Sequence, residues 1–273
     1  MQEQRLAANA SDPSVDGGLV AWHEAGVQGV LVAGGAPARV PGLHPALGGA
    51  RLAVIRDGGV HVQATSGPPF ALSLPAPGAD AVAVSAAWVA WRAREGDRDV
   101  LYAAPLAGGA PVRLNSAPEL GRPALEGSAL VYHVGGQTGG RIVVHDLAAG
   151  SVRTARRERR AQLLNPSLLG GRLLYVRAVY SRQELRLGPL SRRPTRRDRR
   201  LWSTIPTGRR DAGHEPGKRH HRHGHPHRLW RRPREGLSAT LWTTALGADA
   251  AYVTRLTQVA GQPLFAEILR VPR

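Results

Sequence analysis

A short apolar strand pattern that recurs along the chain limits its fold more than any other feature. The runs occupy residues 19–22, 52–55, 88–91, 130–132, 173–176 and 251–253, and the early ones begin 33 to 43 residues apart. A repeat period of this length is typical of folds built from stacked modules. Because one such module cannot bury its own faces, the modules must pack against one another.

A Pro-Gly element stands directly before four of these runs. It combines a proline, small or apolar residues and a glycine turn, at 12–18, 44–49, 122–127 and 165–171. This order predicts a strand, a tight turn and then the apolar strand. Alternating strands follow, for example at 141–147 and 151–154. Four short antiparallel strands about every 40 residues is the pattern of a β-propeller blade.

The two ends of the chain complement each other. The last repeat has three strand patterns, at 240–245, 251–256 and 263–269, and then the sequence stops, whereas residues 4–9 precede the first Pro-Gly element. A first strand that completes the last sheet would remove open edges. We therefore predict an all-β, six-bladed β-propeller whose last blade is closed by the N-terminal strand. A β-sandwich or two unrelated β-domains would not explain this match.

The chain is expected to form one domain over 1–273. The predicted blades run over about 12–43, 44–78, 79–121, 122–164, 165–206 and 236–273, the last together with 3–8. Residues 207–235 are predicted to form a long, flexible, basic His/Arg-rich loop inserted before the last blade.

The repeats resemble those of the TolB-like propellers, a family with WD40-like (PD40) repeats. The similarity rests on Asp16-Gly17 followed by the apolar run 19–22, and on 144–147, where an apolar strand ends in His145-Asp146-Leu147. It covers nearly the whole chain except about 191–236. The resemblance implies a protein-binding module of the cell envelope, in some members an accessory domain beside a catalytic one.

Positive charge is concentrated in one segment. The net charge is +17, and residues 191–236 hold fifteen Arg or Lys and four acidic residues, which leaves +6 for the rest. Clustered arginines bind phosphates well. The candidate polyanion ligands are Arg196, Arg197, Arg199, Arg200, Arg219 and Arg222. No aromatic residue interrupts these runs and no nucleic-acid motif is present, so nucleic acid is a disfavoured partner.

The same segment holds six of the eleven histidines. Neutral imidazole binds zinc, nickel and copper, which makes a weak metal site conceivable. Its candidates are His221, His223, His225 and His227. Gly224 and Pro226 prevent a helix that would align them. A solvated loop is the favoured interpretation, and a sequence artefact is a further alternative to a functional segment.

No complete catalytic motif occurs. The chain has no cysteine, which excludes disulfides and a thiolate nucleophile. The glycines before Lys218 do not match a phosphate loop, and the nearest nucleophile elbow, 236–240, ends in threonine where glycine is required. We predict no catalytic residues and no cofactor.

The starts of the innermost strands should meet at the mouth of the central channel. The candidate binding residues there are Asp12, His44, Asp80, Arg122 and Asn165. A mixed polar ring of this kind favours recognition over catalysis. We predict a non-catalytic scaffold that binds a protein or peptide. The alternatives are a propeller hydrolase, lyase or lactonase with a metal at the central channel, and polyanion binding through the basic loop.

We expect a monomer with no membrane span, because no run of about 18 apolar residues occurs. The given chain begins without a signal peptide. The family resemblance implies the cell envelope, the periplasm or the exterior if a signal is missing from this chain, and otherwise the cytoplasm. The identity of the partner stays open at this stage.

Overall fold

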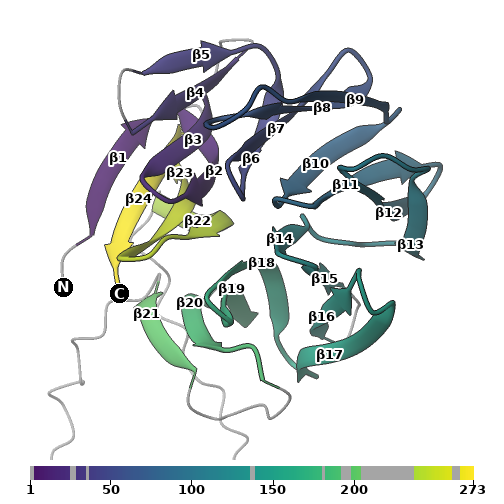
Figure 1. The fold of residues 1–273 in the computed structure, drawn as a ribbon. Coiled ribbons are helices and arrows are strands. Elements are labelled where there is room, and N and C mark those ends of the chain that lie inside the picture. The colour runs from purple at the N-terminus through teal and green to yellow at the C-terminus, as the bar shows by residue number, and fades with distance from the viewer. Residues whose placement is uncertain are drawn as a thin grey trace, which may run out of the picture.

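The computed structural model describes residues 3–24, 29–34, 37–135, 139–179, 182–191, 198–203, 237–259 and 265–273. These residues form no helix, and so none that is long and apolar enough to cross a membrane. Their strands form six four-stranded sheets arranged as blades around a central channel (Figure 1). The predicted six-bladed β-propeller is confirmed.

Each blade is an antiparallel sheet, and in blades 1 to 5 the strands run outward from the channel in chain order. Blade 1 consists of β2 (Ala10–Asp16), β3 (Leu19–Glu24), β4 (Val30–Ala33) and β5 (Ala38–Val40). Blade 2 consists of β6 (Leu43–Leu47), β7 (Arg51–Arg56), β8 (Gly59–Ala64) and β9 (Ala71–Pro75). Blade 3 consists of β10 (Ala79–Val84), β11 (Trp88–Glu95), β12 (Arg98–Pro105) and β13 (Val112–Ala117). Blade 4 consists of β14 (Ala124–Glu126), β15 (Ala129–Val134), β16 (Gly140–Asp146) and β17 (Ser151–Glu158). Blade 5 consists of β18 (Gln162–Leu169), β19 (Arg172–Val179), β20 (Arg182–Pro189) and β21 (Arg199–Ser203).

Blade 6 joins the two ends of the chain. Its strands are β22 (Leu237–Leu246), β23 (Ala250–Val259), β24 (Phe265–Pro272) and β1 (Gln4–Ala8). In the antiparallel pair of β1 and β24, Gln4 lies opposite Arg270 and Ala8 opposite Glu267. The N-terminal strand therefore closes the ring, as its sequence pattern predicted (Figure 1).

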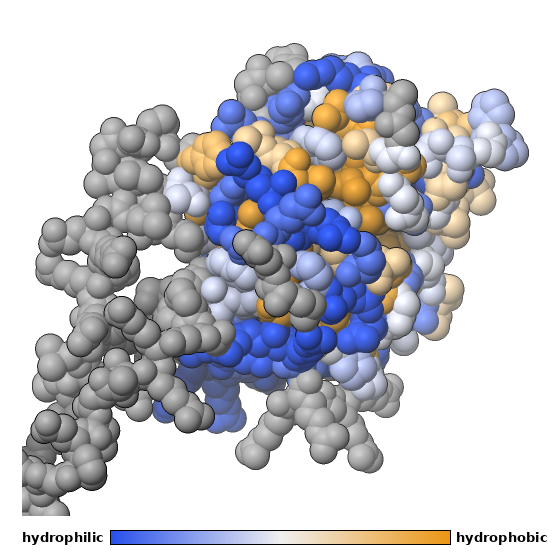
Figure 2. Space-filling view, turned by 90° about the vertical axis from the view of Figure 1, so that its left-hand side faces the viewer, coloured by the Kyte–Doolittle hydropathy of each residue, from blue (hydrophilic) through white to orange (hydrophobic). Residues whose placement is uncertain are grey.

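The core consists of six hydrophobic clusters, one at each interface between neighbouring blades. Leu101 of blade 3 packs with Leu130 of blade 4, and Ile268 of blade 6 packs with Trp22 of blade 1. Burial of both faces of each sheet explains why the second strand of each blade is a continuous apolar run. On the outer side of the ring that bears β1, hydrophilic residues surround smaller apolar areas (Figure 2).

Serine side chains near the ends of the innermost strands tie neighbouring blades together. Ser14 Oγ accepts a hydrogen bond from Leu47 N at 2.7 Å, and Ser167 Oγ accepts one from Leu246 N at 2.9 Å. Ser85 Oγ donates to Gly127 O at 2.8 Å. These bonds join blades 1 and 2, 5 and 6, and 3 and 4, and so fix the wall of the channel.

A bulge recurs within three innermost strands. Asp12, His44 and Asn165 have positive φ values of 55°, 52° and 47°. Each precedes a proline and lies where the register of its strand shifts. Asp, Asn and His adopt this conformation more readily than most residues. A bulge redirects a side chain. The side chain before each proline therefore does not follow the regular alternation of the strand that comes after it.

Candidate functional site: a charged bridge and a vestibule in the central channel

Three of the five predicted mouth residues meet in one ionic network. Asp12 Oδ1 lies 2.7 Å from Arg122 Nη1, and Asp12 Oδ2 lies 2.7 Å from His44 Nδ1. Arg122 also donates to Pro45 O through Nη2 at 2.7 Å. Because blade 4 faces blade 1 across a six-bladed ring, the Arg122 side chain spans the channel and contacts blades 1 and 2.

Asp12 is the centre of this network and only 6% exposed. Burial raises the pKa of its carboxyl, but the Arg122 guanidinium and the hydrogen bond from His44 outweigh burial and hold the pKa well below its usual range. Its backbone N–H donates to Thr254 Oγ1 at 3.2 Å, and Thr254 in turn hydrogen-bonds to Thr243. The carboxylate is therefore ionised and its partners hold it in place.

Asp80 and Asn165 lie outside this network. Arg92 binds both carboxylate oxygens of Asp80 at 2.7 Å, within blade 3. Asn165 Nδ2 donates to Trp242 O at 2.6 Å, and its backbone N–H donates to His133 Nδ1 at 3.1 Å. Asn165 thus links blade 5 to blades 4 and 6. These contacts give both residues a structural role in the ring.

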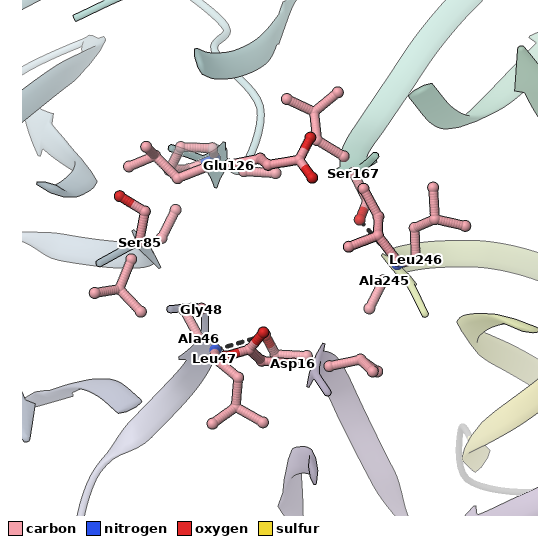
Figure 3. A pocket seen from close by; sticks show the side chains of 18 of the residues that line it. Asp16, Ala46, Leu47, Gly48, Ser85, Glu126, Ser167, Ala245 and Leu246 are labelled. Carbon is pink, nitrogen blue, oxygen red and sulfur yellow. Dashed lines mark hydrogen bonds between the residues drawn. The ribbon is translucent and has the colours of Figure 1, made fainter. Parts of the chain in front are cut away.

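A vestibule of about 290 Å³ occupies the channel between the Arg122 bridge and the glycine turns. The innermost strands of all six blades line it (Figure 3). Its wall combines small or apolar side chains, such as Ala46, Leu47 and Leu246, with the hydroxyl groups of Ser14, Ser85 and Ser167. It is larger than a second hollow, of about 210 Å³, in blade 4.

Two carboxylates face each other across the vestibule, Asp16 from blade 1 and Glu126 from blade 4 (Figure 3). Asp16 Oδ2 accepts a hydrogen bond from Ala50 N at 3.0 Å. Glu126 accepts from Gly170 N at 2.5 Å and from Gly171 N at 3.3 Å. An ionised carboxyl group has about four acceptor positions, so each one can accept further donors.

The sequence-based site missed these vestibule residues. Asp16 and Glu126 occupy the position just before the glycine turn of the Pro-Gly element, and this shared position was the available signal. A residue there looks like part of an ordinary turn until the closed ring shows that the ends of all six innermost strands surround one hollow.

Most residues of the basic segment lie outside the described part of the chain. This applies to His221, His223, His225, His227, Arg196, Arg197, Arg219 and Arg222. Arg199 and Arg200 lie in β21, where Arg200 Nη1 is 3.6 Å from Glu184 and Arg199 is exposed. Within the described ranges, no group of three or more His, Cys, Asp or Glu residues is placed to hold a metal ion.

The fold and the channel define a six-bladed β-propeller. No known family model matches the chain, and no curated protein matches its sequence. Among solved structures, acylaminoacyl peptidase from Pyrococcus horikoshii is similar with a TM-score of 0.55 and 10% identity, over 98% of this chain and 46% of that one. A chain of the nidogen/laminin complex is similar with a TM-score of 0.50 and 9% identity, over 92% and 88%.

TolB from Acinetobacter baumannii is similar with a TM-score of 0.49 and 14% identity, over 90% of this chain. This chain spans 59% of the TolB chain and 46% of the peptidase. Together with the six four-stranded blades, the likeness to the peptidase and to the nidogen/laminin chain confirms the expected propeller fold.

Proposed function

We propose that this protein is a binding scaffold that receives an extended peptide segment of a partner protein in the vestibule. The observation that carries the proposal is the hollow itself, which all six blades line and which the Arg122–Asp12 bridge spans at its inner end. A segment would enter from the face that bears the glycine turns and stop at the bridge.

The size and lining of the vestibule suit a short segment. Its volume of about 290 Å³ is near the lower end of the range typical of ligand pockets, roughly 300–1,000 Å³. Apolar side chains offer contact area, and three serines and two carboxylates offer fixed polar partners. Hydrogen bonds between blades hold this wall in place, which lowers the entropy cost of binding.

The charge of the vestibule favours a basic segment. Among the described residues that line it, Asp16 and Glu126 are the only acidic ones and Arg122 is the only basic one. Because Asp12 neutralises Arg122, the two carboxylates dominate the local potential. A lysine or arginine side chain between them would be attracted, and complementary charge also speeds association. The nidogen/laminin structure, a protein complex, supports a binding role for a propeller of this extent.

Selection from a displayed library of random unstructured peptides tests the proposal. We expect the wild-type protein to enrich peptides that carry Lys or Arg and bind with 1:1 stoichiometry. Ala86 lies exposed at the vestibule, so Ala86→Trp should obstruct the hollow and weaken binding of the selected peptides by at least about tenfold, or 1.4 kcal/mol.

The matched control is Ala149→Trp, in an exposed turn of blade 4 outside the vestibule. It should bind the selected peptides as the wild type does. Equal binding by wild type and Ala86→Trp, or no enrichment above a library without target, would contradict the proposal.

A further inference from the structure

The surplus positive charge of the folded part belongs to blades 4 and 5. Among the described residues between 139 and 203, twelve are arginine and four are acidic. The remaining described residues hold twelve arginines and thirteen acidic residues. Blades 4 and 5 therefore carry a positive surplus separate from the basic segment at 204–236.

Part of this surplus surrounds a second hollow, of about 210 Å³. It lies where the β15–β16 hairpin meets the link from β17 to β18, and its described lining is Val134, Gly135, Gly139, Gly140, Arg141, Arg157, Glu158 and Arg159. We call it the arginine hollow. Its one acidic residue, Glu158, is already bound by Arg177, with Arg177 Nη2 at 2.8 Å from Oε2.

Among the described residues, the three arginines of the hollow have no carboxylate partner, in contrast to many other arginines. Arg39, Arg94 and Arg255, for example, each pair with an acidic residue at 2.8, 2.9 and 2.6 Å. No described residue forms an ion pair with Arg141, Arg157 or Arg159. The positive charge of the hollow is therefore not neutralised within the described chain.

Two of these arginines oppose each other directly. Arg141 of β16 is the register partner of Arg157 of β17. Like charges in directly opposite positions of an antiparallel pair destabilise it. An anion bound between the two guanidinium groups would replace repulsion by two charge-assisted interactions.

The backbone that carries these arginines is fixed. Gly140 N donates to Ala161 O at 2.9 Å, which holds the hairpin against the link. A Cβ atom on Gly139, whose φ is +148°, would lie 2.2 Å from Glu158 O. Only glycine allows this close approach of the two backbone segments.

We propose that the arginine hollow binds a phosphate group, through the guanidinium groups of Arg141, Arg157 and Arg159. A planar guanidinium group can bind two phosphate oxygens at once. The one carboxylate in the described lining of the hollow, that of Glu158, is already paired with Arg177 and so does not compete for these arginines. The group is either inorganic phosphate or a phosphate monoester, such as a phosphorylated side chain. This site is distinct from the vestibule and does not depend on the function proposed for it.

Calorimetric and thermal-shift titrations of the full chain test this site. The probes are inorganic phosphate and O-phosphoserine, at an ionic strength held constant with chloride. We expect Arg157→Gln to weaken binding of the effective probe at least tenfold. In chloride alone, the same variant should be no less stable than the wild type, because the repulsion from Arg141 is removed.

Arg172→Gln is the matched control, because Arg172 is exposed in blade 5 outside the hollow. It should bind the probes as the wild type does. Binding of inorganic phosphate supports a free ion, and binding of phosphoserine alone supports an esterified group. Equal probe affinity in wild type and Arg157→Gln would overturn the proposal. The proposal would also fail if Arg157-dependent binding were found for a single-stranded RNA but for neither small probe.

Discussion

Removal of residues 2–8 is expected to lower the free energy of unfolding of the ring substantially. This deletion removes β1, which pairs with β24 over the register from Gln4 opposite Arg270 to Ala8 opposite Glu267. Each lost ladder hydrogen bond costs about 1 kcal/mol, so the loss is on the order of 3 kcal/mol or more. Global stabilities of domains are only about 5–15 kcal/mol. Thermal unfolding followed by circular dichroism should show a markedly lower Tm.

The truncated protein should also aggregate, because β24 becomes an open edge that can pair with other chains. A synthetic peptide of residues 1–9, added in excess, should restore the Tm and the monomeric state, and a scrambled peptide should not. A truncated chain that unfolds at the wild-type temperature would show that β1 does not close the ring.

Asp12→Asn is expected to cause the largest loss of stability among single substitutions in the channel. Asn keeps the shape and tolerates the positive φ of 55°, so the change isolates the charge. Arg122 and His44 would lose their shared carboxylate in a buried setting. Removing one partner of a buried ion pair costs about 3 kcal/mol, which corresponds to a Tm lower by roughly 5–10 °C.

The effect of Asp12→Asn should depend on pH. The folded protein lowers the pKa of Asp12, whose neighbours include Arg122, His44 and His23. The stabilising contribution is therefore fully present above the unfolded value of about 3.9 and is lost as the pH falls toward the folded pKa. The difference in unfolding free energy between wild type and variant should shrink below about pH 4.

Asp16→Asn is the matched control, since Asp16 accepts one backbone hydrogen bond, from Ala50, in the vestibule. Its cost should stay below about 1 kcal/mol. If denaturant unfolding shows equal destabilisation by the two substitutions, the ion pair of Asp12 and Arg122 contributes no more to stability than the single backbone hydrogen bond of Asp16.

The repeat pattern was sufficient to predict the blades and their closure. Each Pro-Gly element encodes a local strand and turn, and the match between 4–9 and the incomplete last repeat encodes a single long-range pairing. Both are backbone features that depend on residue type and order. They can be predicted without knowing how any particular side chain is oriented.

Side-chain partners across the channel could not be predicted in this way. Asp12 and Asp80 looked equivalent as ring residues, yet Arg122 reaches Asp12 across the channel whereas Arg92 of the adjacent strand binds Asp80. The outcome depends on the width of the channel and on the bulge at Asp12, which precedes a proline. Blade 3 has its own register shift at Asp80, but no proline follows it. The charge of blades 4 and 5 was also hidden, because a total of +6 for everything outside residues 191–236 does not show that nearly all of it lies in these two blades.

Closure by the N-terminal strand is tested most directly by a disulfide. The chain has no cysteine, so Gln4→Cys with Arg270→Cys introduces one possible pair at a register match of β1 and β24. Opposite residues in an antiparallel pair have Cα atoms about 4.5–5.5 Å apart, within disulfide range. Gln4→Cys with Val152→Cys, on exposed β17 of blade 4, is the control pair.

On mild oxidation, the first pair should form an intramolecular disulfide that raises the Tm and increases mobility on a non-reducing gel, and the control pair should not. If the cysteines at 4 and 270 stay reduced or link only separate molecules, the N-terminal strand does not complete the sixth blade.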